Sequence, residues 1–375
     1  MPAPLFGRGR LFARIVTQVD IRPGVEGDPL TSPGERLKYL GLPPPPSGHH
    51  VRVAPGVHWV RLPLPMELDH INVWLLEHEG GFVLVDTGIA SSLTREAWER
   101  LEREVFAEHP LRLILLTHLH PDHVGLAAWL QARHSVPVWA SRQTEALVAS
   151  LLRPLTEAEL AERTGFFVRH GLENATQIEE FLRGGRYRSA VSGMPRIEHW
   201  PADGDEVAWG GINWRFLDTP GHASGHLCLH AAAAAVLIAG DQVLPTISPN
   251  VSLTGWNADD DPLASYLDSL ERLSTLSPET LVLPSHGRPF RGLRERAADL
   301  RGHHHGQLAR LIEACATPMS AHQCAGILFR RSLRGLHQFL ALGEAIAHLE
   351  YLVGAGKLKR STDAQGIIRY ARANG

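Results

Sequence analysis

The stretch that most constrains this chain is residues 117–125, which have the sequence THLHPDHVG. It places three histidines and one aspartate within six residues, directly after the apolar run 113–116, which is typical of a buried strand. The residues from 122 to 131 have the composition of a helix. Four side chains of metal-ligand type therefore lie where a strand ends and a helix begins, a common location for sites in α/β proteins.

The spacing within this stretch suits metal ions. His118 and His120 lie two residues apart on an extended segment, so their side chains point to the same side. Asp122 and His123 follow on the turn into the helix and point toward a second position nearby. So short a peptide cannot easily bring all four side chains to one ion, and two adjacent ions fit it better. The alternative, a polar loop without ligands, would leave several crowded titratable groups unexplained.

Three later segments also end an expected strand with a residue of ligand type. They are TPGH, GD and SHG, which carry His222, Asp241 and His286. With the first stretch they supply five imidazoles and two carboxylates, which divide into two sets of three with one carboxylate to share. These groups suit Zn²⁺, and also Mn²⁺ or Fe²⁺. Three protein ligands per ion leave a position for water, and two adjacent ions can hold a bridging hydroxide at neutral pH.

Length and composition limit the remaining classes. The 375 residues can form one large domain and a smaller one, and the net charge of -3 gives no general attraction to nucleic acid or acidic membranes. No apolar run approaches the ~20 residues that span a bilayer. The arginine-bearing N-terminus lacks a secretory signal; a surface arm fits it better than a transit segment. The three scattered cysteines indicate a reducing compartment, so we expect a cytoplasmic protein.

The pattern of apolar runs and breakers predicts three regions. Residues 1–50 form an accessory arm that ends in a proline-rich linker. Residues 51–290 form the main domain, in which strands split by Pro and Gly precede alternating helices and strands. Within it, residues 143–190 have helical periodicity without a strand candidate, and they form either a lid over the site or a peripheral decoration. Residues 291–375 are expected to form three helices and a hairpin, the pattern of a winged helix.

The ordered motifs THLHPDHVG, TPGH, GD and SHG resemble those of the metallo-β-lactamase superfamily over about residues 55–290. The resemblance implies an α+β fold, a four-layer αββα sandwich with a dimetal site at one edge of its two sheets. It implies that the first metal is bound by His118, His120 and His222, the second by Asp122, His123 and His286, and that Asp241 bridges both. It further implies that Asp86, in the sequence DTG, supports the ligands from behind.

Within the superfamily the chain differs from the antibiotic-degrading members, which are secreted and lack a bridging aspartate like Asp241. It more closely resembles glyoxalase II-like hydrolases and β-lactamase-like proteins with a C-terminal winged-helix extension. We therefore predict a hydrolase with two Zn²⁺ ions per chain, in which a metal-bridging hydroxide attacks a thioester or another small ester or lactone. Asp122 is the predicted catalytic residue, which orients the water or accepts its proton.

Two other activities of this superfamily remain as alternatives. The winged-helix-like tail suggests a metal-dependent endoribonuclease for single strands, and mono-iron persulfide dioxygenases share the HxHxDH pattern. The expected helix 336–353 argues against nucleic acid, because no Arg or Lys lies between Gly335 and Gly356, whereas phosphate binding needs basic side chains. We therefore expect a small-molecule substrate, no membrane partner, and a packing or dimerisation role for the tail, which allows a homodimer.

Four further residues have a weaker claim to the site. His226 either supports the metal ligands or is a satisfied core histidine. His70 precedes an expected strand and either reaches the mouth of a substrate pocket or belongs to a turn. Trp256 either lines that pocket or belongs to the acidic turn before the next helix. His304, in a run of three histidines, either contacts substrate or belongs to the polar face of a helix.

Overall fold

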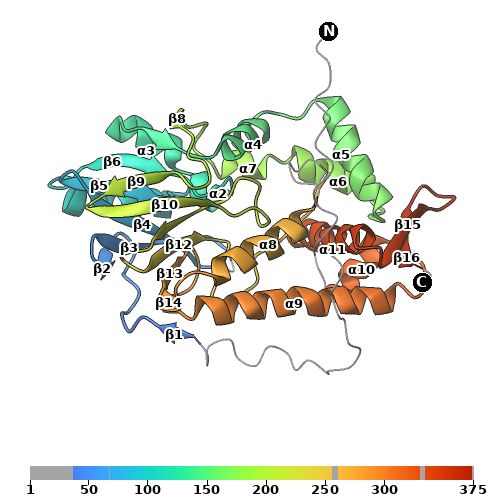
Figure 1. The fold of residues 1–375 in the computed structure, drawn as a ribbon. Helices are drawn as coiled ribbons and strands as arrows, with labels where there is room; N and C mark the ends of the chain where they lie inside the picture. Colours follow the sequence, from blue (N-terminus) through green and yellow to red (C-terminus); the bar gives the residue numbers. More distant parts are fainter. Residues whose placement is uncertain (1–36, 67, 256–260, 330–333, 374–375) are drawn as a thin grey trace, which may run out of the picture.

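The computed structural model describes residues 37–373 apart from 67, 256–260 and 330–333. Its main body contains two seven-stranded sheets that pack face to face. Helices α1 (Ser92–Leu101) and α3 (Ala127–His134) cover one sheet, and α8 (Pro262–Ser274) and α9 (Leu293–Ala314) cover the other (Figure 1). The four-layer αββα fold expected from the sequence is therefore confirmed.

In the first sheet, the strands lie side by side in the order in which they occur along the chain. Its strands from β2 to β5 pair antiparallel, whereas those from β5 to β8 pair parallel. All five residues of β5 are buried, as is typical of a strand that is covered on both faces. The strands of this sheet are β2 (His50–Ala54), β3 (Val57–Pro63), β4 (His70–His78), β5 (Gly81–Val85), β6 (Leu111–Leu115), β7 (Val138–Trp139) and β8 (Ile197–His199).

The second sheet combines the C-terminal half of the main domain with one strand from the N-terminal segment. In spatial order it contains β1 (Lys38–Tyr39), β14 (Phe290–Arg291), β13 (Leu281–Pro284), β12 (Val236–Gly240), β11 (Leu227–Ala231), β10 (Ile212–Asp218) and β9 (Glu206–Trp209). Only the pair of β12 and β13 is parallel among the described strands of this sheet. Residues 38–39, expected in an accessory arm, thus join the sheet, and residues 1–36 lie outside the described part.

Side chains that alternate in direction along the strands place core residues on both faces of each sheet. In β6, Leu113 and Leu115 pack between the two sheets, whereas Ile114 and the following Leu116 pack toward the outer helices. Successive side chains of a strand point to opposite faces, so this apolar run fills both layers. The burial of this apolar run fixes the position of the chain up to Thr117, and the predicted ligands begin at the next residue.

The helix expected over residues 122–131 is divided into α2 (Pro121–Val124) and α3. Gly125 lies between them and approaches the loop that follows β5. A Cβ atom on Gly125 would lie 2.5 Å from the carbonyl oxygen of Gly88, so only glycine fits. Similarly, α1 is followed directly by a π turn, η2 (Glu102–Phe106).

The region 143–190 is helical, as expected, and it links the main body to the C-terminal region (Figure 1). The Phe181 ring stacks on that of Phe339 with 3.7 Å between ring centroids. On the other side, the Tyr187 hydroxyl donates to the carbonyl oxygen of Leu119 at 2.6 Å, inside the metal-type motif. The helices of this insertion are α4 (Arg142–Leu152), α5 (Glu157–Arg169), α6 (Ala175–Arg183) and α7 (Arg186–Ser189).

The C-terminal region contains three helices and a hairpin, in agreement with the expected elements. After α9 come α10 (Ala321–Leu328), α11 (Leu336–Gly354), β15 (Leu358–Thr362) and β16 (Ile368–Arg372). Its assignment as a winged helix stays a prediction. Within the described part of the chain, no helix combines the length and apolar character that crossing a membrane requires.

Candidate metal centre

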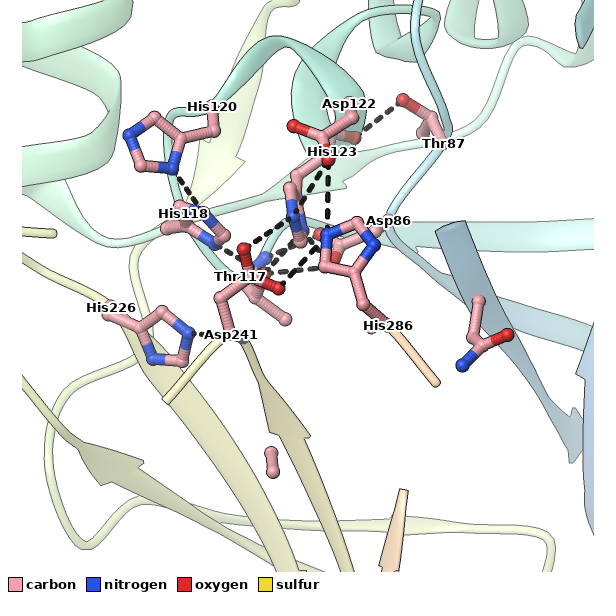
Figure 2. A network of polar contacts seen from close by, with 12 residues as sticks. Asp86, Thr87, Thr117, His118, His120, Asp122, His123, His226, Asp241 and His286 are labelled. Atoms are coloured by element: carbon pink, nitrogen blue, oxygen red, sulfur yellow. Dashed lines mark hydrogen bonds and ion pairs between the residues drawn. The ribbon is translucent and has the colours of Figure 1, made fainter. Parts of the chain in front are cut away.

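Loops at the ends of four strands bring together the seven side chains that the sequence singles out. Figure 2 shows Asp241 below the loop that carries the first motif, with His118 and His120 on one side and His286 on the other. The ligand-type atoms form two groups, each within 4.8 Å of one another: His118, His120, His222 and Asp241 in the first, and Asp122, His123 and His286 in the second.

Three imidazoles of the first group face one point. The Nδ1 atom of His120 lies 2.9 Å from Nε2 of His118 and 3.0 Å from Nε2 of His222. The outer nitrogen of His222, Nδ1, donates to the carbonyl oxygen of Asn250 at 2.8 Å. Because a carbonyl can only accept, this bond leaves the lone pair of His222 on Nε2, directed at the other ligand atoms.

The second group lies around the two carboxylates. The Nε2 atom of His286 is 3.3 Å from Oδ2 of Asp122 and 3.5 Å from Oδ1 of Asp241. The Nε2 atom of His123 is 3.5 Å from Oδ2 of Asp241. That same Oδ2 atom lies 3.4 Å from Nε2 of His222 in the first group. The carboxylate of Asp241 therefore lies between the two groups and faces both.

The donor set fits two divalent cations. The Nε2 atom of His123 and the Oδ1 atom of Asp241 are buried and have no hydrogen-bond partner among the described residues. The side chains of the centre therefore do not satisfy one another's hydrogen-bonding groups. Each buried polar atom without a partner costs about 1–3 kcal/mol of stability. Imidazole nitrogen and carboxylate oxygen are ligands of Zn²⁺, Mn²⁺ and Fe²⁺, and a cation in each group would use both atoms.

Asp86 supports the first motif from the loop after β5. Its carboxylate accepts hydrogen bonds from the backbone N–H of Thr117, the Thr117 hydroxyl and Nδ1 of His123, each at 2.8 Å. In the neutral ring that ligation requires, the bond from Nδ1 leaves the lone pair of His123 on Nε2. Since the Thr117 hydroxyl donates to Asp86, its oxygen can accept from Nδ1 of His118 at 3.0 Å. Asp86 thus contacts both Thr117 and His123 from behind the motif, and its role in supporting bound metal stays a prediction.

The two weaker histidine candidates at strand ends lie behind the ligands. The Nδ1 atom of His226 donates to the Thr219 hydroxyl at 2.9 Å, and its Nε2 atom accepts the backbone N–H of Asp241 at 3.2 Å. His226 therefore positions the backbone of Asp241. The His70 carbonyl oxygen accepts from Nδ1 of His286 at 2.8 Å, and its ring accepts from the N–H of Gly287 at 2.9 Å. His70 thus holds His286 in place, and its position at a pocket mouth stays a prediction.

The other two candidates for the substrate pocket are Trp256 and His304. Trp256 lies outside the described residues. His304 is completely buried, with its Nδ1 atom 3.0 Å from Nε2 of His348. The polar-face interpretation is therefore wrong for His304, although its neighbour His305 is exposed. A buried ring between α9 and α11 does not offer a surface to substrate.

Two supporting residues are missed by sequence analysis. Thr117 is the first residue of the first motif, and its position directly after a buried strand is a signal that could have identified it. Asn250 lies 28 residues from His222, in a segment without a motif. Its role comes from its backbone carbonyl, which no side-chain pattern reveals.

Burial and charge set the protonation of the two groups differently. Burial, together with repulsion from His222, lowers the pKa of His120 to about 3, so this ring is neutral. Burial would likewise lower the pKa of His286, but Asp241 and Asp122 raise it to about 10. Burial favours the neutral acid at Asp122, yet His123 and His286 lower its pKa to about 2. The pKa of His123 is likewise raised despite burial, chiefly by Asp86, so the metal-free second group holds its protons on the imidazoles and keeps its carboxylates ionised.

Metal uptake by the metal-free protein is therefore expected to release a proton and to weaken at low pH. His286 is protonated below a pKa of about 10, and a cation binds only its neutral form. Between pH 6 and 8 the apparent affinity of the second group should rise by about tenfold per pH unit for each displaced proton. Calorimetric Zn²⁺ titrations in buffers of different ionisation enthalpy measure this. An affinity that is independent of pH would contradict it.

Comparisons with known proteins agree with this fold. A family model described as "Metallo-beta-lactamase superfamily" matches residues 66–286, and one described as "Metallo-beta-lactamase-like, C-terminal domain" matches residues 308–373. Two packed sheets between helices, with a His/Asp-rich centre at their loops, define a metallo-hydrolase. The chain belongs to the metallo-β-lactamase superfamily.

Several individual proteins are similar to the chain over most of its length. The crystal structure of a β-lactamase domain protein from Burkholderia ambifaria is 41% identical, covers 90% of this chain and 99% of its own, and has a TM-score of 0.83. A probable metallo-hydrolase of Bacillus subtilis is 26% identical over 78% of this chain and 91% of its own. A hydroxyacylglutathione hydrolase of Aeromonas salmonicida is 26% identical over 59% of this chain and 63% of its own.

Proposed function

We propose that this metal-dependent hydrolase holds two divalent cations, Zn²⁺ foremost, and cleaves a thioester or another small ester or lactone. The observation that carries the proposal is the position of Asp241 between two complete groups of donors. A shared carboxylate between groups of this kind favours two adjacent ions over one. The similarity to a hydroxyacylglutathione hydrolase supports a thioester as the leading substrate class.

The proposed ligands follow the two groups of the structure. The first cation would be held by His118, His120 and His222, the second by Asp122, His123 and His286, and Asp241 would contact both. Two such cations supply a hydroxide nucleophile at neutral pH and polarise a carbonyl oxygen. Mn²⁺ or Fe²⁺ would suit the same donors.

The residues of the chain contribute orientation and charge. Asp122 retains 18% side-chain exposure against 10% for Asp241, so it is the carboxylate with better access to solvent. Because its pKa is lowered despite burial, Asp122 is ionised and can accept a hydrogen bond from a water molecule. We propose that it orients the attacking water and accepts its proton. Asp86 and His226 keep the ligands in place throughout.

Two observations disfavour the alternative activities, those of a persulfide dioxygenase and of an endoribonuclease. The second group of donors is as complete as the first, which favours two ions over the single iron of a persulfide dioxygenase. Most of α11 is buried, and its buried residues include Ala341, Leu342, Ile346 and Leu349. A helix packed on several sides is not available to enter a nucleic-acid groove, which disfavours the endoribonuclease.

A hydrolysis panel combined with a metal count tests the proposal. We expect turnover of thioesters or lactones that is lost with a chelator and restored by Zn²⁺, and about two catalytic metals per chain. The panel should include β-lactams, phosphodiesters and single-stranded RNA, with Asp122→Asn as the inactive control. Metal-dependent RNA cleavage without ester hydrolysis would refute the assignment. A single iron with no second metal would refute the two-ion centre.

A further inference from the structure

A second cluster of ligand-type side chains lies between α9 and α11, outside the catalytic centre. His304 comes from α9, and Glu344 and His348 lie one turn apart on α11. One ligand atom from each residue lies within 4.8 Å of the others. His304 and His348 are completely buried and Glu344 is 7% exposed. Charged and titratable side chains are rarely buried together unless a partner or a metal ion satisfies them.

The two imidazoles are arranged as metal ligands are. Nδ1 of His348 donates to the carbonyl oxygen of Glu344 at 2.7 Å, which leaves the lone pair on Nε2. His222 and His286 in the catalytic centre are fixed by bonds of the same type, each 2.8 Å long. Nε2 of His348 lies 3.0 Å from Nδ1 of His304, the separation also found between His120 and His222. The outer Nε2 atom of His304 faces the Ser248 hydroxyl at 3.3 Å.

Glu344 completes the cluster with a carboxylate. Its Oε2 atom accepts a hydrogen bond from the side-chain amide of Asn250 at 2.7 Å. Burial raises the pKa of Glu344 to about 7, and no cationic side chain in the described part of the chain lowers it. A buried carboxylate without a cation is costly, and a divalent cation would provide the missing counter-charge.

We propose that Nδ1 of His304, Nε2 of His348 and the carboxylate of Glu344 bind a third divalent transition-metal ion, of the class of Zn²⁺. Two imidazoles and one carboxylate are a donor set for such ions. The burial of all three ligands suits a structural ion that joins α9 to α11. The site also connects to the catalytic centre, because Asn250 donates to Glu344 through its amide and accepts from His222 through its carbonyl.

The competing arrangement contains no metal. In it, the Ser248 hydroxyl, His304 and His348 form a hydrogen-bonded chain that ends on the Glu344 carbonyl, and the carboxyl group is neutral. The two arrangements predict different metal contents, which can be measured without any assay of hydrolysis. Failure of the proposed catalytic function would therefore leave this inference intact, and the reverse also holds.

The experiment is a metal count on the full-length protein, purified with Zn²⁺ and freed of loosely bound ions. We expect about three metals per chain in the unaltered protein and about two in His348→Gln and in Glu344→Gln, whose amide oxygen still accepts from Asn250. The matched control is His305→Ala on the same helix, whose exposed side chain lies outside the cluster, and it should retain three. A double variant of the catalytic centre, His120→Ala with Asp241→Ala, should retain one.

Anomalous diffraction from crystals of the unaltered protein at the zinc edge gives a second readout that needs no variant. We expect a peak between His304, Glu344 and His348 in addition to those of the catalytic centre. No peak at this position, or two metals in the unaltered protein and in the His348→Gln variant alike, would overturn the proposal.

Discussion

Replacing Asp241 by asparagine is expected to abolish turnover and to reduce the metal content of both groups. The side chain faces His222 on one side and His286 on the other, and asparagine removes the negative charge that two cations would share. Loss of a residue that only supports a ligand costs about 10–100-fold in metal affinity or activity, and loss of a shared ligand should exceed this range. His120→Ala should have a similar effect, because Nδ1 of His120 faces both other imidazoles of its group.

The measurement is kcat/KM on the best substrate of the panel together with metal content. Asp203→Asn provides the matched control, since it makes the same chemical change at a partly exposed carboxylate that pairs with Arg272. This control should keep its activity and metal. Full activity in Asp241→Asn or in His120→Ala would refute the centre as proposed.

Gly221→Ala is expected to destabilise the fold by roughly 3 kcal/mol or more. The glycine has φ of +130°, a conformation that residues with a Cβ atom rarely adopt. An added Cβ atom would lie 2.4 Å from Cα of Tyr266, at the backbone of α8, so the clash cannot be relieved by turning a side chain. Because His222 follows directly, any shift of this loop also displaces a ligand of the first group.

Thermal or urea unfolding of the metal-loaded protein measures the effect, and metal content reports the displacement of His222. Gly302→Ala, in the interior of α9, is the matched control. In the described part of the chain, nothing beyond its chain neighbours and its own helix backbone lies within 4 Å of a Cβ added there, so the change should be neutral or stabilising by up to about 1 kcal/mol. Equal stabilities of the two variants would show that the close approach of Gly221 to α8 is not required.

The insertion contacts both the C-terminal region and the loop that carries the first motif. Phe181 of α6 stacks on Phe339 of α11, while Tyr187 of α7 bonds to the loop that carries the first motif. Asn250 adds a third connection between α11 and His222. The C-terminal region is thus connected to His222 by hydrogen bonds through Asn250.

The sequence alone was sufficient for features that depend on neighbouring residues. The run 113–116 followed by THLHPDHVG predicts a buried strand, a turn and a helix, and β6 and α2 have this arrangement. Alternation along a strand is a local property, so the apolar pattern also indicates the strands of both sheets. The seven donors were identifiable because each ends a strand beside a Gly or Pro or within the HxHxDH spacing.

Only the tertiary structure shows which distant groups satisfy each other. The carbonyl of Asn250 and the cluster of His304, Glu344 and His348 have no local pattern. His304 and His348 meet because α9 and α11 pack at one register, although they lie 44 residues apart. A histidine on a helix has the same local sequence whether it faces solvent or another helix. The partners of such a histidine are decided by how whole helices pack. The contacts between two helices depend on their relative rotation and translation, which no short stretch of sequence encodes.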